Sequence, residues 1–242
     1  MSVVLGCVQP AFLAWVPFFQ RMAASDVFVY LDDVEFSRNS PHNRNRILSA
    51  HGPQLMTVPV RYRGHSHAFI CNIEIAQLRD WQRKHLRSIE MNYHRAPYFR
   101  DLDNPLRKIY GAPWLRLGDL NVALLDLFRD YLGIRTPCFR SSQMHVEGSG
   151  NEKLVNLCRR VGAMRFLVKP GTEHYHPPDY FAERGIELNP FHYSFDPYPQ
   201  SLPGFVPALS VLDYAMNCGP SSLGKSGDGT EGMTRASGRL ES

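Results

Sequence analysis

The stretch SVVLGCVQPAFLAWVPFFQRMAASDVFVYLDD, residues 2–33, decides the fold class. Its first part, residues 3–8, is a short apolar run that ends before Pro10, as a strand buried on both faces does. Apolar residues at helical spacing follow, and Pro17 requires that helix to begin near it or to bend there. Residues 27–31 are β-branched and aromatic, which predicts a second strand. The order strand, helix, strand predicts an α/β fold with a Rossmann-like parallel sheet flanked by helices.

Further alternation of helices and strands follows along the chain, and we expect a small helical subdomain in addition to the sheet. The predicted elements are a strand over 54–63 that Pro59 places at an edge or an end, a helix over 80–99 with Asp80 as a cap, a helix over 120–134 closed by Gly133, a helix and a strand within 151–168, and a short helix over 210–219. We expect residues 1–219 to form one domain. Residues 220–242 are rich in Gly, Ser and charges, which predicts a flexible tail.

Composition narrows the class of protein. The 242 residues are 43% hydrophobic, enough for one substantial core, and the net charge of +4 is mild and scattered. We therefore expect a small-molecule substrate, and no nucleic-acid or membrane partner, because no nucleic-acid-binding motif or membrane-length apolar run is present. The cysteines are odd in number, widely spaced and set among apolar neighbours, which favours a reducing, cytoplasmic location. They are Cys7, Cys71, Cys138, Cys158 and Cys218.

Acidic side chains follow the second predicted strand, in LDDVEFSRNSPHNRNRI, residues 31–47. In open parallel sheets ligands bind beyond the carboxyl ends of the strands, where Asp32, Asp33 and Gln9 are expected to lie. One carboxylate can then act as acid, base or ion ligand while the other anchors the loop. The alternative is a turn in which an aspartate accepts hydrogen bonds from nearby backbone amides.

The same stretch ends in alternating asparagines and arginines. If residues 43–46 are extended, Asn43 and Asn45 share one face while Arg44 and Arg46 share the other. One pair would meet a ligand, and the other would pair with the aspartates or face solvent. Arginine offers a planar fork that matches phosphate or carboxylate, whereas a solvated charged face is the alternative.

Other candidates are more isolated. His85, on the helix predicted over 80–99, is a candidate general base, although a single helical histidine is more often a packing residue. His174 and His176 lie near two acids in GTEHYHPPDYF, residues 171–181, and offer metal-ligand types in what is also a common loop sequence. Cys7 lies near the expected pocket and is a candidate nucleophile, although a small cysteine with apolar neighbours on a buried strand is usually a packing residue. We predict no metal and no cofactor.

Signatures of three common enzyme classes are missing from the predicted α/β domain. There is no GxSxG elbow around any serine. The patterns GxxxxGK[ST], in GPSSLGKS (219–226), and GxGxxG, in GDGTEG (227–232), occur in or next to the predicted tail and follow no predicted strand, so neither has the strand-loop-helix context of a phosphate loop or a dinucleotide fingerprint. These observations argue against hydrolase, kinase and dehydrogenase activities.

Five stretches together resemble the WbqC-like protein family over residues 3–219. They are QPAFLAWVPFF (9–19), VFVYLDDVEFSRNSPHNRNRI (27–47), LMTVPV (55–60), DWQRKHLRSIEMNYHRAPYF (80–99) and FVPALSVLDYAMNCG (205–219). The resemblance implies an enzyme-like protein of surface-polysaccharide or specialised-metabolite pathways, including antibiotic biosynthesis.

The resemblance also carries site residues and marks departures. The residues it implies are Gln9, Asp32, Asp33, Asn43, Arg44, Asn45, Arg46, Lys84, His85, Tyr93 and Tyr98. This chain has Ala14 to Pro17 where the family usually has a Pro-aromatic-hydrophobic-Gly step, and Val168 and Lys169 where it usually has Ser-Gly. Both changes predict an altered substrate.

The resulting hypothesis is a transferase that moves an acyl or aminoacyl group to an amine from a carrier-bound or nucleotide-linked donor. Asp32, Asp33 and His85 are the predicted catalytic residues, and an acyl-carrier protein is a candidate partner. The arginines would hold an anion, and the amide side chains would orient the acceptor. Two alternatives are a nucleotidyltransferase-like enzyme and a non-catalytic module that binds a sugar or a carrier protein.

Overall fold

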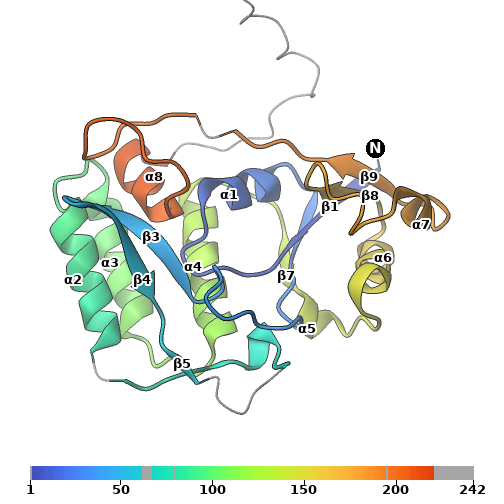
Figure 1. Ribbon diagram of the computed structural model, residues 1–242, viewed down its shortest axis with the longest axis horizontal. Helices are drawn as coiled ribbons and strands as arrows, with labels where there is room; N and C mark the ends of the chain where they lie inside the picture. Colours follow the sequence, from blue (N-terminus) through green and yellow to red (C-terminus); the bar gives the residue numbers. More distant parts are fainter. Residues whose placement is uncertain (1, 62–66, 79, 195, 221–242) are drawn as a thin grey trace, which may run out of the picture.

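A computed structural model describes residues 2–61, 67–78, 80–194 and 196–220 (Figure 1). In chain order its elements are β1 (Val3–Val8), α1 (Val16–Ala23), β2 (Val27–Tyr30), β3 (Arg44–Ser49), β4 (Gly52–Thr57), β5 (Val60–Arg61), η1 (Ile70–Asn72), β6 (Glu74–Ile75), α2 (Trp81–Tyr93), α3 (Phe99–Gly111), α4 (Leu117–Tyr131), β7 (Cys138–Arg140), α5 (Ser141–Met144), α6 (Gly150–Val161), β8 (Ala163–Val168), α7 (Pro178–Ala182), β9 (Glu187–Pro190) and α8 (Val211–Cys218). Beyond Pro220, the predicted tail lies outside the described residues.

A five-stranded sheet forms the centre of the molecule, in the order β7-β2-β1-β8-β9, and every neighbouring pair is parallel. Leu5 of β1 lies opposite Val27 of β2, so the first two strands pair as the sequence predicts. The chain leaves β1 toward β2 on one side and later returns to β8 on the other. The switch point of the sheet therefore lies between β1 and β8. This arrangement confirms the α/β, Rossmann-like prediction.

Both faces of the sheet are covered, because its central strands are apolar on both sides. Phe28 and Tyr30 of β2 belong to the core shared with α1 and α4, whereas Val29 belongs to the core shared with α6 and α7. This alternation follows the two-residue period of a strand. Gly6 marks a close approach in β1, since a Cβ there would lie 2.1 Å from the Ser25 hydroxyl oxygen.

The helices α2, α3, α4 and α8 pack beside the β3–β4 hairpin at one end of the molecule (Figure 1). Their buried side chains, such as Tyr93, Leu102 and Met216, belong to the same core cluster as Phe19 of α1. The predicted helical subdomain is thus continuous with the core on one face of the sheet. None of the helices in the described ranges has both the length and the apolar character needed to cross a lipid bilayer.

Helix boundaries test several local predictions. Pro17 lies in the first turn of α1, and Gly133 follows α4 with φ +70°, both as predicted. Asp80 occupies the N-cap position of α2, as predicted, but its side chain makes no capping hydrogen bond. The backbone of Asp80 has φ +71°, and its carboxylate accepts a hydrogen bond from the Arg83 side chain instead of from a backbone N–H of the helix. The helix predicted over 80–99 also ends at Tyr93, ahead of a turn that leads into α3.

Candidate functional site

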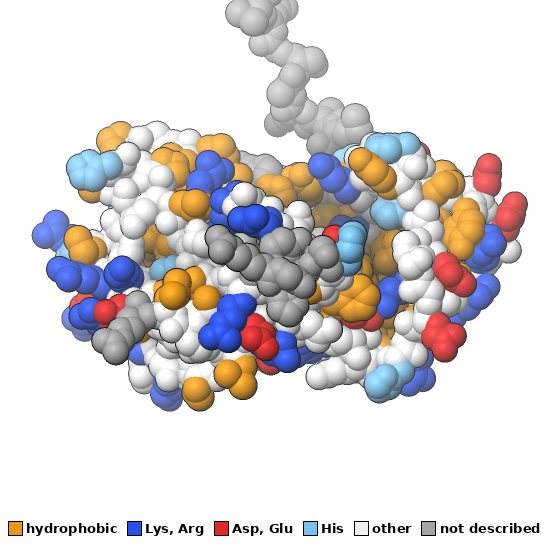
Figure 2. Space-filling model, turned by 60° about the horizontal axis from the view of Figure 1, so that its bottom comes forward, with side chains coloured by type: hydrophobic (Ala, Val, Ile, Leu, Met, Phe, Trp, Pro, Cys, Tyr) orange, Lys and Arg blue, Asp and Glu red, His pale blue; other side chains and the backbone are white. Residues whose placement is uncertain are grey.

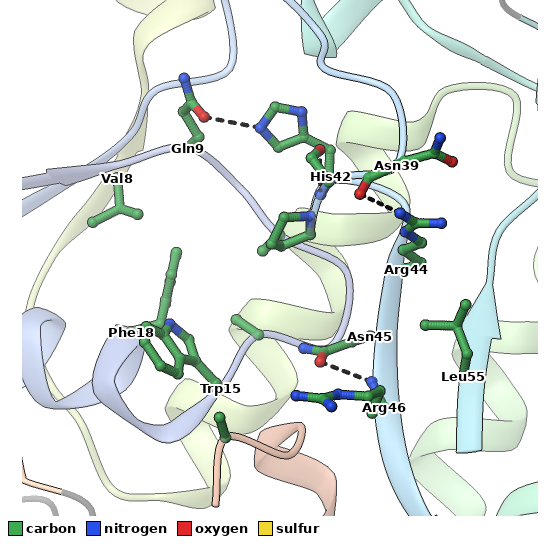
Figure 3. Close-up of a pocket in the computed structure, with 15 residues that line it drawn as sticks. Val8, Gln9, Trp15, Phe18, Asn39, His42, Arg44, Asn45, Arg46 and Leu55 are labelled. Atoms are coloured by element: carbon green, nitrogen blue, oxygen red, sulfur yellow. Dashed lines mark hydrogen bonds between the residues drawn. The ribbon is translucent and has the colours of Figure 1, made fainter. Parts of the chain in front are cut away.

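A cavity of about 570 Å³ opens beyond the carboxyl end of β1, one of the two strands at the switch point (Figure 3). Its walls come from the end of β1, the following loop, α1, the 39–42 turn and the β3–β4 hairpin. The lining residues are Val8, Gln9, Ala11, Ala14, Trp15, Phe18, Asn39, Ser40, Pro41, His42, Arg44, Asn45, Arg46, Leu55 and Ala208. Its size is typical of a small-molecule site, with one mostly apolar wall and a few polar groups.

Gln9 and His42 form a fixed pair on the polar side of this cavity. The backbone N–H of Ser37 donates to His42 Nδ1 at 3.1 Å, so the ring proton is assigned to Nε2, which donates to Gln9 Oε1 at 2.9 Å. Burial lowers the pKa of His42 to about 4, which keeps the ring neutral near pH 7. His42 therefore sets the orientation of the Gln9 amide, whose NH₂ group is left as a donor for a ligand.

Two arginines give the cavity its charge. Arg44 and Arg46 alternate with Asn45 along β3, and Arg46 lies opposite Leu55 in the hairpin. The Arg44 guanidinium donates to the backbone carbonyl of Asn39, whereas the Arg46 guanidinium has no hydrogen-bond or ion-pair partner within the described part of the chain. Figure 3 shows the Arg46 side chain extending toward Trp15. No acidic residue is among the described residues that line the cavity, so an anionic group is the favoured ligand.

The two asparagines of the same stretch have different partners. Asn45 Nδ2 donates to the carbonyl of Leu13 at 2.7 Å and so ties β3 to the loop that follows β1. Asn43 is buried, and its Nδ2 donates to the carbonyl of Val58 at 3.0 Å. Asn45 thus lines the cavity while holding its wall, and Asn43 lies outside the lining. Arg44, Asn45 and Arg46 all line the cavity, so the prediction that only one of the two pairs would meet a ligand does not match this lining.

Asn121 of α4, which the sequence did not single out, connects the two loops of the cavity. Its side chain is fully buried and its Nδ2 donates to the carbonyl of His42 at 2.8 Å and to that of Pro10 at 3.4 Å. A buried NH₂ group that donates to two loop carbonyls restricts the movement of both loops, while Asn121 Oδ1 is buried and accepts no hydrogen bond from the described residues. The polar side of the cavity is therefore held in place before any ligand binds.

Asp32 and Asp33 lie in a second polar cluster at the carboxyl ends of β2 and β7. The Asp32 side chain is fully buried, and its carboxylate accepts from Arg140 Nε at 2.7 Å and from Ser142 Oγ and N, each at 2.9 Å. Ser141 Oγ accepts from the Asp32 backbone N–H at 3.0 Å and donates to Asp33 Oδ1 at 2.5 Å. Both aspartates thus have fixed hydrogen-bond partners.

Two cations balance this carboxylate pair. Arg140 also donates to Asp119 at 2.6 Å, and Lys153 of α6 pairs with Asp33. Burial by itself lowers the pKa of Arg140, but its hydrogen bonds with Asp119 and Asp32 raise that pKa above its ordinary value. The aspartates therefore pair with distant cations and with neither Arg44 nor Arg46. These contacts favour a structural role for Asp32, while its role as an acid or base stays a prediction.

Comparison with known proteins identifies the family. The model of the WbqC-like protein family matches residues 9–225. The chain belongs to the WbqC-like protein family. It is 33% identical over 217 residues to "Uncharacterized protein Rv1507c" of Mycobacterium tuberculosis (strain ATCC 25618 / H37Rv), an alignment that covers 89% of this chain and 94% of that protein. No solved structure matches the chain.

His85 of the WbqC-like chain is buried between helices and not in the cavity lining. The rings of Phe12, Trp81 and Tyr110 surround it, with centroids 5.6, 5.3 and 5.7 Å from the imidazole. Burial lowers its pKa to about 4, against the opposing effect of a hydrogen bond with the backbone of Thr57. A general base must reach the substrate proton, and the cavity described above does not include this side chain. Its catalytic role stays a prediction.

Three further residues that the family resemblance implies lie outside the cavity lining. The Tyr93 hydroxyl donates to Asp213 Oδ1 at 2.8 Å and accepts from the backbone N–H of Leu48 at 2.9 Å. Tyr98 lies before α3, with its ring against Gly219. Lys84 is exposed on α2, at the end of the molecule where Figure 2 shows Lys and Arg side chains gathered.

The remaining sequence candidates lie outside the cavity lining. His176 Nδ1 bonds with Asn151 Oδ1 at 2.8 Å, and no group of three or more metal-binding side chains converges anywhere in the described ranges. Cys7 is buried in the core beside α6, and burial raises the pKa of its thiol to about 12. A thiol with so high a pKa is a poor nucleophile near neutral pH.

Proposed function

We propose that this WbqC-like protein is a transferase that binds a phosphate-bearing or carboxylate-bearing donor in the cavity beside β3. The donor is a carrier-linked or nucleotide-linked acyl or aminoacyl compound of a surface-glycan or specialised-metabolite pathway, and the acceptor is an amine. The observation that carries the proposal is a cavity lined by Arg44 and Arg46 without an acidic residue among its described lining. The five free cysteines fit the reducing cytoplasm that the proposal assumes.

The geometry supports catalysis by positioning and charge stabilisation. Arg46 can bind the anion, the Gln9 amide can donate to a carbonyl or phosphate oxygen, and Trp15 offers an apolar wall. A neutral amine is itself a nucleophile, so direct transfer needs no nucleophile from the protein. The amine nitrogen forms a bond to the acyl carbon, the bond from that carbon to the leaving group breaks, and the proton lost by nitrogen ends on the leaving group. Fixed donors stabilise the negative charge that develops.

The same lining also favours a second candidate, a non-catalytic module that binds the anion. Among the described lining residues the only group that titrates between pH 2 and 12 is His42, whose two ring nitrogens are already hydrogen-bonded. A side chain of that kind is a weak acid–base catalyst. This candidate predicts stoichiometric binding of the donor with no product in the presence of any amine.

Calorimetry and mass spectrometry test the proposal. Acetyl-coenzyme A and a uridine-diphosphate sugar serve as probes, with Arg46→Gln as the variant and Arg87→Gln, exposed on α2, as the control. Loss of a charge-assisted hydrogen bond worth about 1.5–3 kcal/mol should weaken binding roughly tenfold to a hundredfold. The control should bind as the wild type does.

The outcomes separate the two candidates. A new product mass with the wild type in the presence of an amine mixture supports the transferase. Binding that depends on Arg46, without a product, supports the binding module. Equal binding by the wild type and Arg46→Gln, or no binding of either probe, rejects an anion site in this cavity.

A further inference from the structure

A second cavity, of about 130 Å³, adjoins the first. Ala208 lines both, and its backbone has φ +58°, an unusual conformation for a residue other than glycine. A water molecule occupies about 30 Å³ of liquid, so the second cavity holds a ligand of only a few non-hydrogen atoms. Its walls come from α1, α8 and the segment before α8.

Aromatic rings form much of its wall. The Tyr198 ring meets Phe205 and Tyr214 edge-on, with centroid distances of 5.2 and 5.1 Å and interplanar angles of 76° and 85°. The Tyr198 hydroxyl donates to Asp213 Oδ2 at 2.8 Å, and Tyr93 donates to the other oxygen of the same buried carboxylate. The hydrogen bond to the buried Asp213 carboxylate thus fixes the position of the Tyr198 ring.

Asp196 is the one charged side chain among the described residues that line this cavity. Asp196 is exposed at its rim and accepts from Ser194 Oγ at 2.8 Å. Gln20 Nε2 donates to the carbonyl of Ser194 at 3.3 Å, while Gln20 Oε1 is buried and accepts no hydrogen bond from the described residues. Neither lysine nor arginine is among the described residues that line the cavity. Aromatic side chains and a carboxylate in one lining together match a small cation with N–H donors.

We propose that this second cavity binds a small primary ammonium, the charged form of the amine acceptor. The inference deepens the proposed function, because it places the acceptor next to the donor cavity, and its role in transfer rests on that function. The two cavities then differ in charge. The first has two arginines and no carboxylate among its described lining, and the second has a carboxylate and no basic side chain. Before transfer the ammonium gives one proton to solvent, which leaves the neutral amine as nucleophile.

Ligand-observed NMR titration of the full chain tests this site with propylamine and with propan-1-ol, a neutral probe of the same size. We expect propylamine to bind with a dissociation constant in the roughly millimolar range, as a ligand of few atoms does. Asp196→Asn should weaken propylamine binding about fivefold, the upper end for an exposed charge pair. Phe205→Leu keeps the cavity apolar but removes an aromatic ring, and should weaken propylamine binding by roughly threefold.

Glu187→Gln is the matched control, because it removes one exposed carboxylate on β9, outside the lining. It should bind propylamine as the wild type does. Equal affinity for propylamine and propan-1-ol, no propylamine binding, or an equal loss in the control overturns the ammonium site.

The donor experiment has its own variant. Arg46→Gln should lose donor binding and keep propylamine binding, so failure of the donor proposal and failure of the ammonium site are distinguishable. Circular dichroism of each variant confirms that Asp196→Asn and Phe205→Leu remain folded. Loss of propylamine binding in Arg46→Gln would show that the amine occupies the first cavity, and would also overturn the second site.

Discussion

Substitution of Asp32 by asparagine should destabilise the protein. Its carboxylate is fully buried and accepts from Arg140 Nε at 2.7 Å and from Ser142 Oγ at 2.9 Å through one oxygen. An asparagine amide has only one oxygen. If its NH₂ group replaces the first oxygen, it faces the Arg140 and Ser142 side-chain donors, and if it replaces the second, it faces the Ser142 backbone N–H. In either orientation at least one buried donor loses its acceptor. The guanidinium of Arg140, with a side chain only 17% exposed, also loses a charge partner.

The magnitude follows from these contacts. Removing one partner of a buried ion pair costs about 3–5 kcal/mol, and we expect the lower end, about 3 kcal/mol, because Asp119 still binds Arg140. For a chain of this size each kcal/mol lowers the melting temperature by about 2–4 °C, which gives a drop of roughly 6–12 °C.

Urea unfolding and thermal melts followed by circular dichroism measure this loss. Asp119→Asn is the matched control, because its carboxylate binds the same arginine but is 43% exposed, and its removal should cost about 1 kcal/mol or less. Donor binding and transfer are measured on the same samples. If Asp32→Asn melts within about 2 °C of the wild type but loses transfer, the structural reading is refuted and Asp32 acts as an acid or base.

Three further predictions concern the surrounding fold. Burial lowers the pKa of His42 and of His85 from 6.5 to about 4. Between pH 6.5 and pH 4 the two imidazoles are therefore protonated in the unfolded chain but neutral in the folded chain. The free energy of unfolding should be highest above pH 6.5 and should fall toward pH 4 by up to about 1.4 kcal/mol per pH unit for each histidine. Urea unfolding of His85→Leu should show a smaller fall over the same pH range. Gly6→Ala should lower the free energy of unfolding by at least about 2 kcal/mol, because the new Cβ would clash with Ser25 and Phe28. Gly111→Ala is the control and should melt like the wild type, because no atom lies within 4 Å of the new Cβ. Tyr93→Phe should lose about 1–3 kcal/mol in the same assay, since a buried N–H loses its acceptor, and unchanged unfolding would contradict that contact.

The first βαβ unit was predictable from sequence because its signals are local. Residues 3–8 and 27–30 are apolar runs of strand length, and Pro17 indicates where the helix begins. Helix α3 was missed because only a narrow stripe is buried, Leu102, Leu106 and Tyr110, and Pro105 lies inside it. Strand β9 has four residues and no clear alternation. Helix α3 and strand β9 form because they pack against other helices and strands of the fold, and these tertiary contacts are not visible in their local sequence.

The candidate site was predictable in part for the same reason. Strand alternation places Arg44 and Arg46 on one face of β3, and the end of β1 places Gln9 near them, but alternation does not predict that Asn45 lines the same cavity. His42 was missed although it lies inside the quoted stretch. Its role depends on a turn that brings the Ser37 N–H to one ring nitrogen and on the Gln9 amide meeting the other. A histidine between proline and asparagine gives no sequence signal for either contact.

The charges of the polar stretch could not be assigned from sequence, because their partners are distant. Arg140 meets Asp32 across 108 residues, since β7 pairs with β2 and places Arg140 opposite Tyr30. Lys153 meets Asp33 across 120 residues. Had the aspartates paired with the nearby arginines, the cavity would be neutral and closed to an anion. Two cations from elsewhere in the chain neutralise the aspartates, and this leaves Arg46 available to a ligand. The proposed anion site therefore depends on the tertiary placement of β7 and α6 as much as on the arginines themselves.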